Sequence, residues 1–446
     1  MKKITKIFSA CIISTMLLSS MAGCNKTSDT SKPQEAMGNE TKKTPTKISF
    51  WQFWNIDDSD SSIKPAIDKF NKQNPDIIVD PTQLGWGDGF ARIQTAIGAG
   101  TAPDVLELGS TWVGAFLDLG ALSDLTPYIG DFKKDLINWE LGEKDGKSYV
   151  VPWAVGARAL AMNHDLLKKA GLDPAKPPKN WNELYDYAKT IKEKTGENGF
   201  CINVSDPTGG YQLFNNFLFS AGGNMIINVQ EKSGDKTVEK QRSGVMSPES
   251  KKAMDFLVKM KPYSLIDTLD NAKLQFANGK LGMFIVESSL YADLLLQGKA
   301  PKEWSSVAIP ASPDTGKSKC FLGAEVLTIP VQSKNKEAAV KFLRYASSAP
   351  VASEVCKFAQ YSILPSTSNL AEDPAFKNPG NESIRNVIPF IQLMKDGKAM
   401  PPPLHKDIEN IGMRMSVMMD EIFSDNMNPE KAMKECETEI NKLYLK

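Results

Sequence analysis

The strongest constraint on the fold is an alternation of strand and helix patterns in the first quarter of the chain. The sequence predicts a strand at 47–54, a helix at 63–70, a strand at 77–79, a helix at 90–97 and a strand at 103–106. A helix that crosses between two strands favours a parallel sheet, because parallel neighbours need such a connection. The expected fold class is therefore α/β.

A second informative stretch occupies residues 146–165 in the middle of the sequence. Two apolar runs, 149–151 and 154–162, flank Pro152 and Trp153. Proline interrupts strand pairing, and the tryptophan beside it offers a large hydrophobic surface with a polar N–H tip. We interpret this stretch as the place where the chain crosses between two bodies and leaves an aromatic wall in the gap. An edge strand with a core tryptophan is the alternative.

The length and composition suit a globular protein of more than one domain. At 446 residues the chain is long enough for two or three domains with real cores. Its content of 41% hydrophobic and 24% charged residues is ordinary for a globular protein. Asn180, Ser247 and Asn428 each stand where they can cap a helix, and the charged, turn-rich stretch 227–244 predicts a solvated hairpin or loop.

The N-terminus has the pattern of a secretion signal. A basic start is followed by an apolar segment at 7–18, which is short for a membrane-spanning helix. Small residues then lead through Ala22 and Gly23 to Cys24, in a pattern that resembles the lipobox of bacterial lipoproteins. We expect residues 1–23 to be a signal peptide and Cys24 to carry the lipid. A plain secretion signal is the alternative.

The residues after this cysteine predict a flexible tether. Residues 24–46 contain mainly Ser, Thr, Lys, Pro, Gln, Asn and Gly, which bury too little surface to offset the entropy of ordering. Loss of residues 1–23 removes three lysines and leaves 50 basic against 53 acidic residues, a net charge of −3. This balance gives no basic footprint for nucleic acid.

Metal and redox chemistry find little support in the sequence. The cysteines beyond residue 24 form no Cys-x-x-Cys pair, and the histidines do not cluster. We therefore expect buried free thiols, no metal site and no cofactor. The residues concerned are Cys201, Cys320, Cys356, Cys436, His164 and His405.

Tryptophans are the first indication of function. Five of them fall at or just after predicted strand ends, where ligands bind in open α/β sheets. Flat aromatic faces suit the apolar faces of sugar rings, and neighbouring polar side chains can take the hydroxyls. We expect some of the five to be structural. They are Trp51, Trp54, Trp86, Trp112 and Trp153.

Catalysis is less well supported. The sequence has no Gly-x-Ser-x-Gly elbow, and its histidines have no visible triad partners. Four acidic residues are conceivable as the two carboxylates of a glycosidase, but nothing in their spacing pairs them, so we favour solvated carboxylates or acceptors for sugar hydroxyls. They are Asp88, Glu107, Glu287 and Glu325. The chain has only six arginines, which weighs against a phosphorylated ligand.

From about residue 47 to the C-terminus, a series of short motifs in a fixed order resembles the family 1 extracellular solute-binding proteins, the carbohydrate-binding lipoproteins of bacterial ABC importers. The motifs are Ile48–Trp51, Phe70–Val79, Gly100–Val105, Gly146–Pro152, Met162–Gly171, Phe276–Met283, Ser333–Ala339, Leu364–Ser366 and Asn428–Ala432. The chain departs from the family pattern at His164, where lysine is common, and at Gly323-Ala324, where two glycines are frequent.

The resemblance implies a two-lobed periplasmic-binding-protein-like fold of the maltose-binding type (class II), in which the lobes close on a sugar. By analogy the chain crosses between lobes near 154–157, 307–312 and 347–353. Lobe 1 is then expected at 47–155 plus 309–347, and lobe 2 at 156–308 plus 348–446. The implied partners are a mono- or oligosaccharide and the transmembrane permease subunits, with a monomer anchored by lipid on the outer face of the bacterial cell membrane.

The resemblance also implies where ligand contacts lie. In lobe 1 the family positions map onto Trp51, Trp54, Trp86, Asp88, Thr111 and Trp112. In lobe 2 they map onto Tyr211, Gln212 and Glu287, and Trp153 at the crossing is the strongest single candidate to face the sugar. Two other classes stay open: a secreted glycoside-acting enzyme, and a binder of a sugar phosphate, polyamine or peptide.

Overall fold

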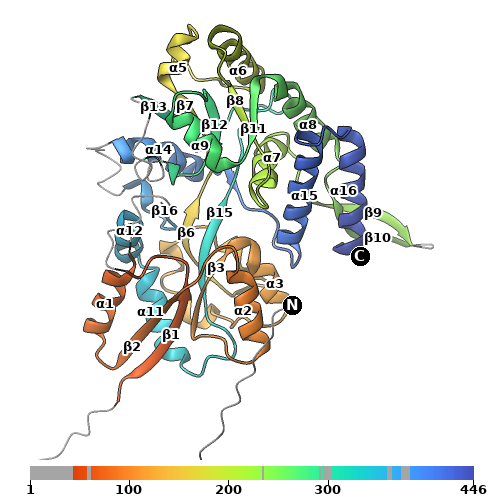
Figure 1. The fold of residues 1–446 in the computed structure, drawn as a ribbon. Coiled ribbons are helices and arrows are strands. Elements are labelled where there is room, and N and C mark those ends of the chain that lie inside the picture. The colour runs from red at the N-terminus through yellow and green to blue at the C-terminus, as the bar shows by residue number, and fades with distance from the viewer. Residues whose placement is uncertain are drawn as a thin grey trace, which may run out of the picture. The chain divides into compact units, whose positions relative to one another are not determined.

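The computed structural model describes residues 44–57, 62–233, 236–290, 294, 301, 303–358, 364–372 and 382–445. The predicted signal peptide, the lipid site at Cys24 and most of the predicted tether lie outside these residues. Residues 44–446 form one compact unit. It contains two lobes, and strands β1 and β2 of the first lie in the lower part of Figure 1.

The first lobe is built on a six-stranded sheet with the order β16-β6-β15-β3-β1-β2. Strand β1 pairs in parallel with both β2 and β3, so the predicted strand–helix alternation is confirmed. β15 runs antiparallel to both of its neighbours, β3 and β6. The strands are β1 (Thr46–Gln52), β2 (Ile77–Gln83), β3 (Val105–Gly109), β6 (Val151–Gly156), β15 (Gly323–Thr328) and β16 (Leu364–Pro365).

Helices cover both faces of this sheet because its strands alternate buried side chains on the two sides. Phe50 of β1 packs in one core with helices α1 (Lys64–Gln73), α11 (Lys336–Ala346) and α12 (Ala349–Phe358). Leu106 of β3 packs in a second core with α2 (Gly89–Gly98) and α3 (Val113–Asp118). Smaller elements of this lobe are α4 (Thr126–Ile129) and the hairpin β4 (Glu143–Lys144) with β5 (Lys147–Ser148).

The second lobe holds a three-stranded sheet of order β12-β7-β13 and a parallel pair, β8 with β11. Its strands are β7 (Ala159–Asn163), β8 (Phe200–Asn203), β11 (Ser264–Asp267), β12 (Met283–Val286) and β13 (Trp304–Val307). Its helices are α5 (His164–Lys169), α6 (Trp181–Thr195), α7 (Gly209–Ser220), α8 (Pro248–Met260), α9 (Leu269–Ala277), α14 (Glu382–Lys395), α15 (Ile408–Phe423) and α16 (Pro429–Leu443).

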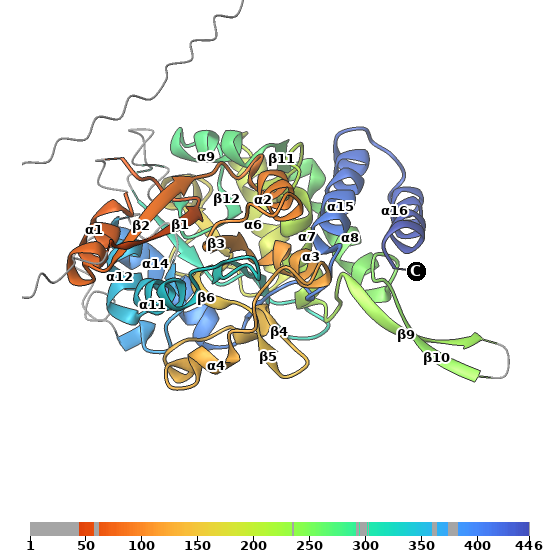
Figure 2. The same cartoon turned by 90° about the horizontal axis from the view of Figure 1, so that it is seen from below.

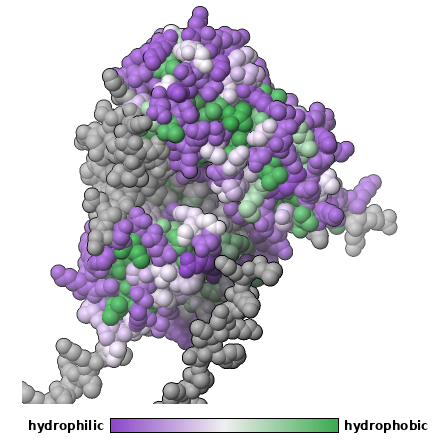
Figure 3. Space-filling model, viewed as in Figure 1, coloured by the Kyte–Doolittle hydropathy of each residue, from purple (hydrophilic) through white to green (hydrophobic). Residues whose placement is uncertain are grey.

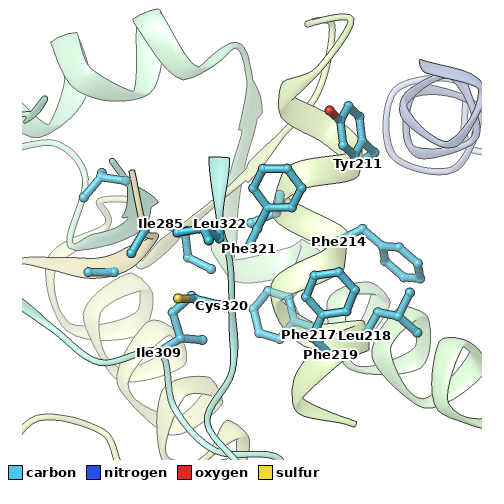
Figure 4. Close-up of a cluster of buried hydrophobic side chains, with 14 of the residues drawn as sticks. Tyr211, Phe214, Phe217, Leu218, Phe219, Ile285, Ile309, Cys320, Phe321 and Leu322 are labelled. Atoms are coloured by element: carbon cyan, nitrogen blue, oxygen red, sulfur yellow. The ribbon is translucent and has the colours of Figure 1, made fainter. Parts of the chain in front are cut away.

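Helix α7 is the centre of the second-lobe core. Eleven of its twelve residues are buried, so the helix is enclosed on all sides, which is typical of a helix inside a protein. Figure 4 shows Phe214, Phe217 and Phe219 of this helix near Phe321, which belongs to the short strand β14 (Cys320–Phe321). β14 pairs with β17 (Ala399–Met400).

The sequence analysis predicted helix caps and a hairpin, and the structure confirms them. The side chains of Asn180, Ser247 and Asn428 accept hydrogen bonds at the starts of α6, α8 and α16. The stretch predicted as a hairpin or loop forms β9 (Ile226–Ser233) and β10 (Lys236–Ser243), which project as a ribbon beside α16 in Figure 2. The four described cysteines are buried and free, as expected.

The chain passes from the first lobe to the second between β6 and β7, so the crossing predicted for the central stretch is present. Pro152 lies where the register of β6 against β15 shifts, which is a position that tolerates a residue without an N–H. The expected aromatic wall is absent, however. Trp153 is only 2% exposed and packs with Phe50 in the first-lobe core.

Two segments next to the expected lobe borders make the following contacts. In the segment expected in lobe 1 from 309 onward, the backbone N–H of Ala311 donates to Lys179, and those of Lys319 and Phe321 donate to the side chains of Ser220 and Asn216 of α7. Residues assigned to lobe 2 from 348 include α12 and β16, which pack on the first sheet. The apolar side chains of α12 pack in the same core as side chains of β1 and β6.

The face shown in Figure 3 is mostly hydrophilic, with hydrophobic residues in separate patches. Within the described residues, no helix is long and apolar enough to cross a membrane.

Candidate functional site

An aromatic cluster lies where strands β1 and β3 of the first lobe end. Trp86 is 49% exposed, and its ring stacks on Phe53 with a centroid distance of 4.0 Å and an interplanar angle of 17°. Trp112 meets both rings, at 5.4 Å from Trp86 and 5.6 Å from Phe53, and is itself buried. Two buried rings therefore hold one half-exposed indole in place.

The aromatic cluster contacts Gly109, the last residue of β3, and Gly109 lies beside a carboxyl group on the next strand. A side-chain carbon at Gly109 would stand 3.3 Å from the Trp86 ring, so the indole lies close against the backbone there. Gly109 is also the register partner of Glu325 on β15. The exposed indole therefore lies against the end of β3, and the carboxyl group of Glu325 lies on the adjacent strand β15.

Trp51 and Asp88 are separate from this cluster. Both line an open groove along α2, together with Arg92 and Thr95. Asp88 is exposed and lies 3.9 Å from Arg92. Trp51 is half-buried against the side of the sheet that α2 covers.

Arg158, at the crossing between β6 and β7, is the main polar link of the site. Its guanidinium is almost fully buried and donates to Glu287 at 2.8 Å, to Gln212 at 2.5 Å and to the carbonyl of Gly156 at 3.2 Å. The guanidinium also lies over the Phe321 ring. These contacts fix Gln212 and Glu287 at the beginning of α7 and the end of β12.

The same groups line a small pocket in the second lobe. Asn203, at the end of β8, contributes to it together with Gly209 and Asn216 of α7. The side-chain oxygen of Asn203 is buried and has no hydrogen-bond partner among the described residues. The pocket therefore combines a cation, a carboxylate and amide groups, which suits a ligand that both donates and accepts hydrogen bonds.

Tyr211 and Thr111 lie near α15 and not at this pocket. Tyr211 is 1% exposed, and its ring leaves no room for a side chain on Gly412 of α15. Burial raises the pKa of its hydroxyl. The hydroxyl of Thr111 bonds to Glu409 of α15, a carboxyl group whose pKa is raised mainly by burial.

Trp54 and Trp153 belong to the buried core of the first lobe. The indole N–H of Trp153 donates to the carbonyl of Ala346 at 3.1 Å, so its polar atom is used within the protein. The indole N–H of Trp54 donates to Glu107 at 3.2 Å and to Glu325 at 2.9 Å. Glu107 and Glu325, whose spacing in the sequence gave no sign of a pair, therefore share one hydrogen-bond donor in the fold.

Of the predicted site residues, Trp86 is half-exposed in the aromatic cluster, and Gln212 and Glu287 line the second-lobe pocket. Trp54, Trp112, Trp153 and Tyr211 are buried. The sequence analysis missed Phe53 and Arg158 as parts of the site. Arg158 is one of only six arginines and follows the central stretch directly, and this was the available signal. Among the described residues, no group of three or more His, Cys, Asp or Glu side chains is placed to hold a metal ion.

Residues 54–353 match the family described as bacterial extracellular solute-binding protein, and the chain belongs to this family. Its two-lobed α/β fold is that of periplasmic binding proteins, as the resemblance implied. The cyclic alpha-maltosyl-1,6-maltose binding protein from Arthrobacter globiformis has a similar structure, with a TM-score of 0.74 at 20% identity, covering 89% of this chain and 98% of that one.

Two sequence relatives indicate the range of the family. The diacetylchitobiose binding protein DasA of Streptomyces coelicolor is 29% identical over 274 residues, which is 59% of this chain and 60% of DasA. The sn-glycerol-3-phosphate-binding periplasmic protein UgpB of Escherichia coli is 26% identical over 369 residues, which is 78% of this chain and 81% of UgpB. The family and these relatives are binding proteins, not enzymes.

Proposed function

We propose that this protein captures a sugar or oligosaccharide between its two lobes and delivers it to the permease of an ABC importer, without acting on any bond. The observation that carries the proposal is the half-exposed Trp86, which Phe53 and Trp112 hold in place at the C-terminal ends of the parallel strands. An exposed tryptophan fixed by two buried rings is a platform for the apolar face of a sugar ring.

We propose that the lobes divide differently from the initial expectation. Lobe 1 comprises the described residues of 44–156 and 323–367, and lobe 2 those of 159–321 and 387–445, on the sheets that their strands join and the backbone contacts of the segment 311–321. A ligand that contacts both lobes stabilises the closed form by its differential affinity for it. The permease then recognises the closed form through the lobe faces beside the ligand.

A neutral ligand fits the charges at the site better than a phosphorylated one. Arg158 is the cation of the second-lobe pocket, and it is already paired with Glu287. Glu325 and Glu107 add further carboxyl groups on the first-lobe side. A phosphate group placed there meets more acidic than basic groups, and like charges at short range disfavour binding.

Tryptophan fluorescence tests the function. We expect one of maltotriose, cellobiose or N,N′-diacetylchitobiose to change the emission of the purified protein and to saturate in the micromolar range. Unchanged amounts of the sugar after prolonged incubation will support binding without turnover. A response only to glycerol 3-phosphate, spermidine or a peptide, or release of shorter sugars, would overturn the proposal.

We also propose that Cys24 is lipid-modified after removal of residues 1–23 and anchors the protein to the outer face of the cell membrane. Replacing Cys24 by alanine is expected to move the protein from the membrane fraction to the soluble fraction and to abolish labelling with palmitate. A Cys201→Ala variant, which changes a buried thiol, serves as the control. Continued membrane association of the Cys24→Ala variant would contradict the anchor.

A further inference from the structure

A buried polar cluster lies on one face of the first-lobe sheet, at the end where β1 and β3 stop. We call Gln52, Trp54, Glu107 and Glu325 the carboxyl cluster. The register of β1 with β3 pairs Phe50 with Val105, and two residues further it places Gln52 beside Glu107. Glu325 is the diagonal neighbour of Glu107, because Leu327 is the register partner of Glu107 and lies on the same face.

Hydrogen bonds fix the geometry of the cluster. The Trp54 indole N–H donates to Glu107 at 3.2 Å and to Glu325 at 2.9 Å, so it bridges the two carboxyl groups. The backbone N–H of Phe53 donates to the second oxygen of Glu107 at 2.9 Å. The two carboxyl groups also hydrogen-bond to each other, and besides burial this contact raises the pKa of Glu107 and lowers the pKa of Glu325. The shared proton therefore lies on Glu107, and Glu325 is the carboxyl of the pair that titrates near neutral pH.

No basic group compensates these two carboxyls. Neither takes part in an ion pair with any described residue, and the other titratable groups that act on Glu325 are Glu287 and the buried thiol of Cys356. Burial raises the pKa of both carboxyl groups, and that of Glu325 to about 7. Two buried carboxyls in contact cannot both ionise without a large electrostatic cost, so the pair holds one proton near neutral pH.

A second observation points to a ligand at this cluster. Gln52 is fully buried, and its side-chain oxygen accepts from the backbone N–H of Trp54 at 2.5 Å. Its side-chain nitrogen has no hydrogen-bond partner among the described residues. A buried donor without an acceptor calls for an oxygen that the protein itself does not supply. Glu325 is the carboxyl of the pair that is partly open to solvent.

We infer that Glu325 is a ligand-binding residue that contacts an uncharged, hydroxyl-bearing ligand as a neutral carboxylic acid, held in that form by burial without a basic partner among the described residues. This inference rests on the proposed sugar-binding function. A carboxylic acid has one donor and further acceptor capacity, and a sugar hydroxyl has the same combination. An anionic ligand meets the carboxylate of Glu287 beside this acid, and binds less well than an uncharged one.

Proton linkage follows from this assignment. A sugar that covers Glu325 removes its remaining solvent, which raises the pKa of its carboxyl group further in the bound state. Binding therefore takes up a proton above about pH 7. Affinity is constant where the acid is already protonated, and it falls by up to about tenfold per pH unit above that pKa, until the pKa of the bound form is reached.

The test begins with the wild-type protein. Side-chain carboxyl pKa values of the ligand-free protein are measured by carbon-13 NMR, with the Glu325→Gln variant to assign the signal. Calorimetric titration with the tightest-binding of the three neutral oligosaccharides, in buffers of different ionisation enthalpy, then counts protons. We expect a Glu325 pKa above 6 and uptake of a fraction of one proton at pH 8.

The variants separate the outcomes. Glu325→Gln keeps a donor and an acceptor, so it should bind within about fivefold of wild type at pH 6 and lose the pH dependence. Glu337→Gln, on the exposed face of α11, should keep it. A Glu325 pKa below 5, no proton uptake, or tighter binding of the amine-bearing sugar chitobiose with rising affinity at higher pH would overturn the inference while leaving sugar binding intact. Binding of no sugar would overturn the proposed function instead, and the NMR measurement would still report on the carboxyl pair.

Discussion

Replacing Trp153 by alanine is expected to lower the free energy of unfolding by about 3–5 kcal/mol, the usual cost of removing a large buried aromatic side chain. The ring contacts Phe50 at 6.3 Å and Trp54 at 5.5 Å between centroids, and the change leaves a cavity between them. It also leaves the carbonyl of Ala346 without its indole donor. Denaturant unfolding followed by circular dichroism measures the loss.

The control for this variant is Trp139→Phe, which keeps an aromatic ring at a buried site of the same lobe and should cost clearly less. Sugar affinity of folded Trp153→Ala protein is expected to stay within a few-fold of wild type, because the ring has almost no exposed surface. Unchanged stability together with a large loss of affinity would show instead that Trp153 contacts the ligand.

Trp153 illustrates what a sequence leaves open. The proline, the adjacent tryptophan and the change of lobe were all visible in the central stretch, and the crossing was predicted correctly. The direction of the side chain was not, because in a strand it depends on register, and a shift of one residue exchanges the two faces. Here the register of β6 against β15 shifts at Trp153, and this shift determines which face of the sheet the Trp153 side chain takes. No local pattern predicts the shift, because β15 lies about 170 residues further along the chain.

The elements themselves were easier to predict because their signals are local. The strand–helix alternation of the first lobe, the capping residues of α6, α8 and α16, and the ribbon of β9 and β10 all follow from patterns within about 20 residues. The lobe borders after residue 309 have no such local signal, because they depend on which core a segment joins. The helix α12 is amphipathic in either lobe, and packing alone places it on the first sheet.

The site shows the same division between local and distant information. The positions of Trp86 and Trp112 after strand ends made them candidates, and the structure places their rings in contact with each other. The pairing of Glu107 with Glu325 joins two strands that are neighbours in the sheet and more than 200 residues apart in the chain. The sequence identified Glu107 and Glu325 as candidate polar residues of the site. Only the antiparallel pairing of β3 with β15 shows that their side chains are neighbours.

The Trp86 platform gives the largest expected effect on binding. Replacing Trp86 by alanine should weaken binding of the responding oligosaccharide by about 10- to 100-fold, which corresponds to about 1.4–2.8 kcal/mol. The indole is 49% exposed, so its removal costs little core packing, and the unfolding free energy should change by less than about 1 kcal/mol. Calorimetric titration of the folded variant measures the affinity.

Two further variants make this prediction specific. Trp86→Phe keeps a flat ring on Phe53 and should recover part of the affinity, whereas Leu119→Ala removes an exposed hydrophobic side chain elsewhere in the first lobe and should leave it unchanged. The carboxyl edge of the sheet presents Trp86 on one side of Gly109 and Glu325 on the other, and we therefore expect a ligand stacked on the indole to reach the carboxyl cluster. If Trp86→Ala bound every sugar as tightly as wild type, the ligand would have to lie elsewhere, and the groove at Trp51 and Asp88 would be the next surface to mutate.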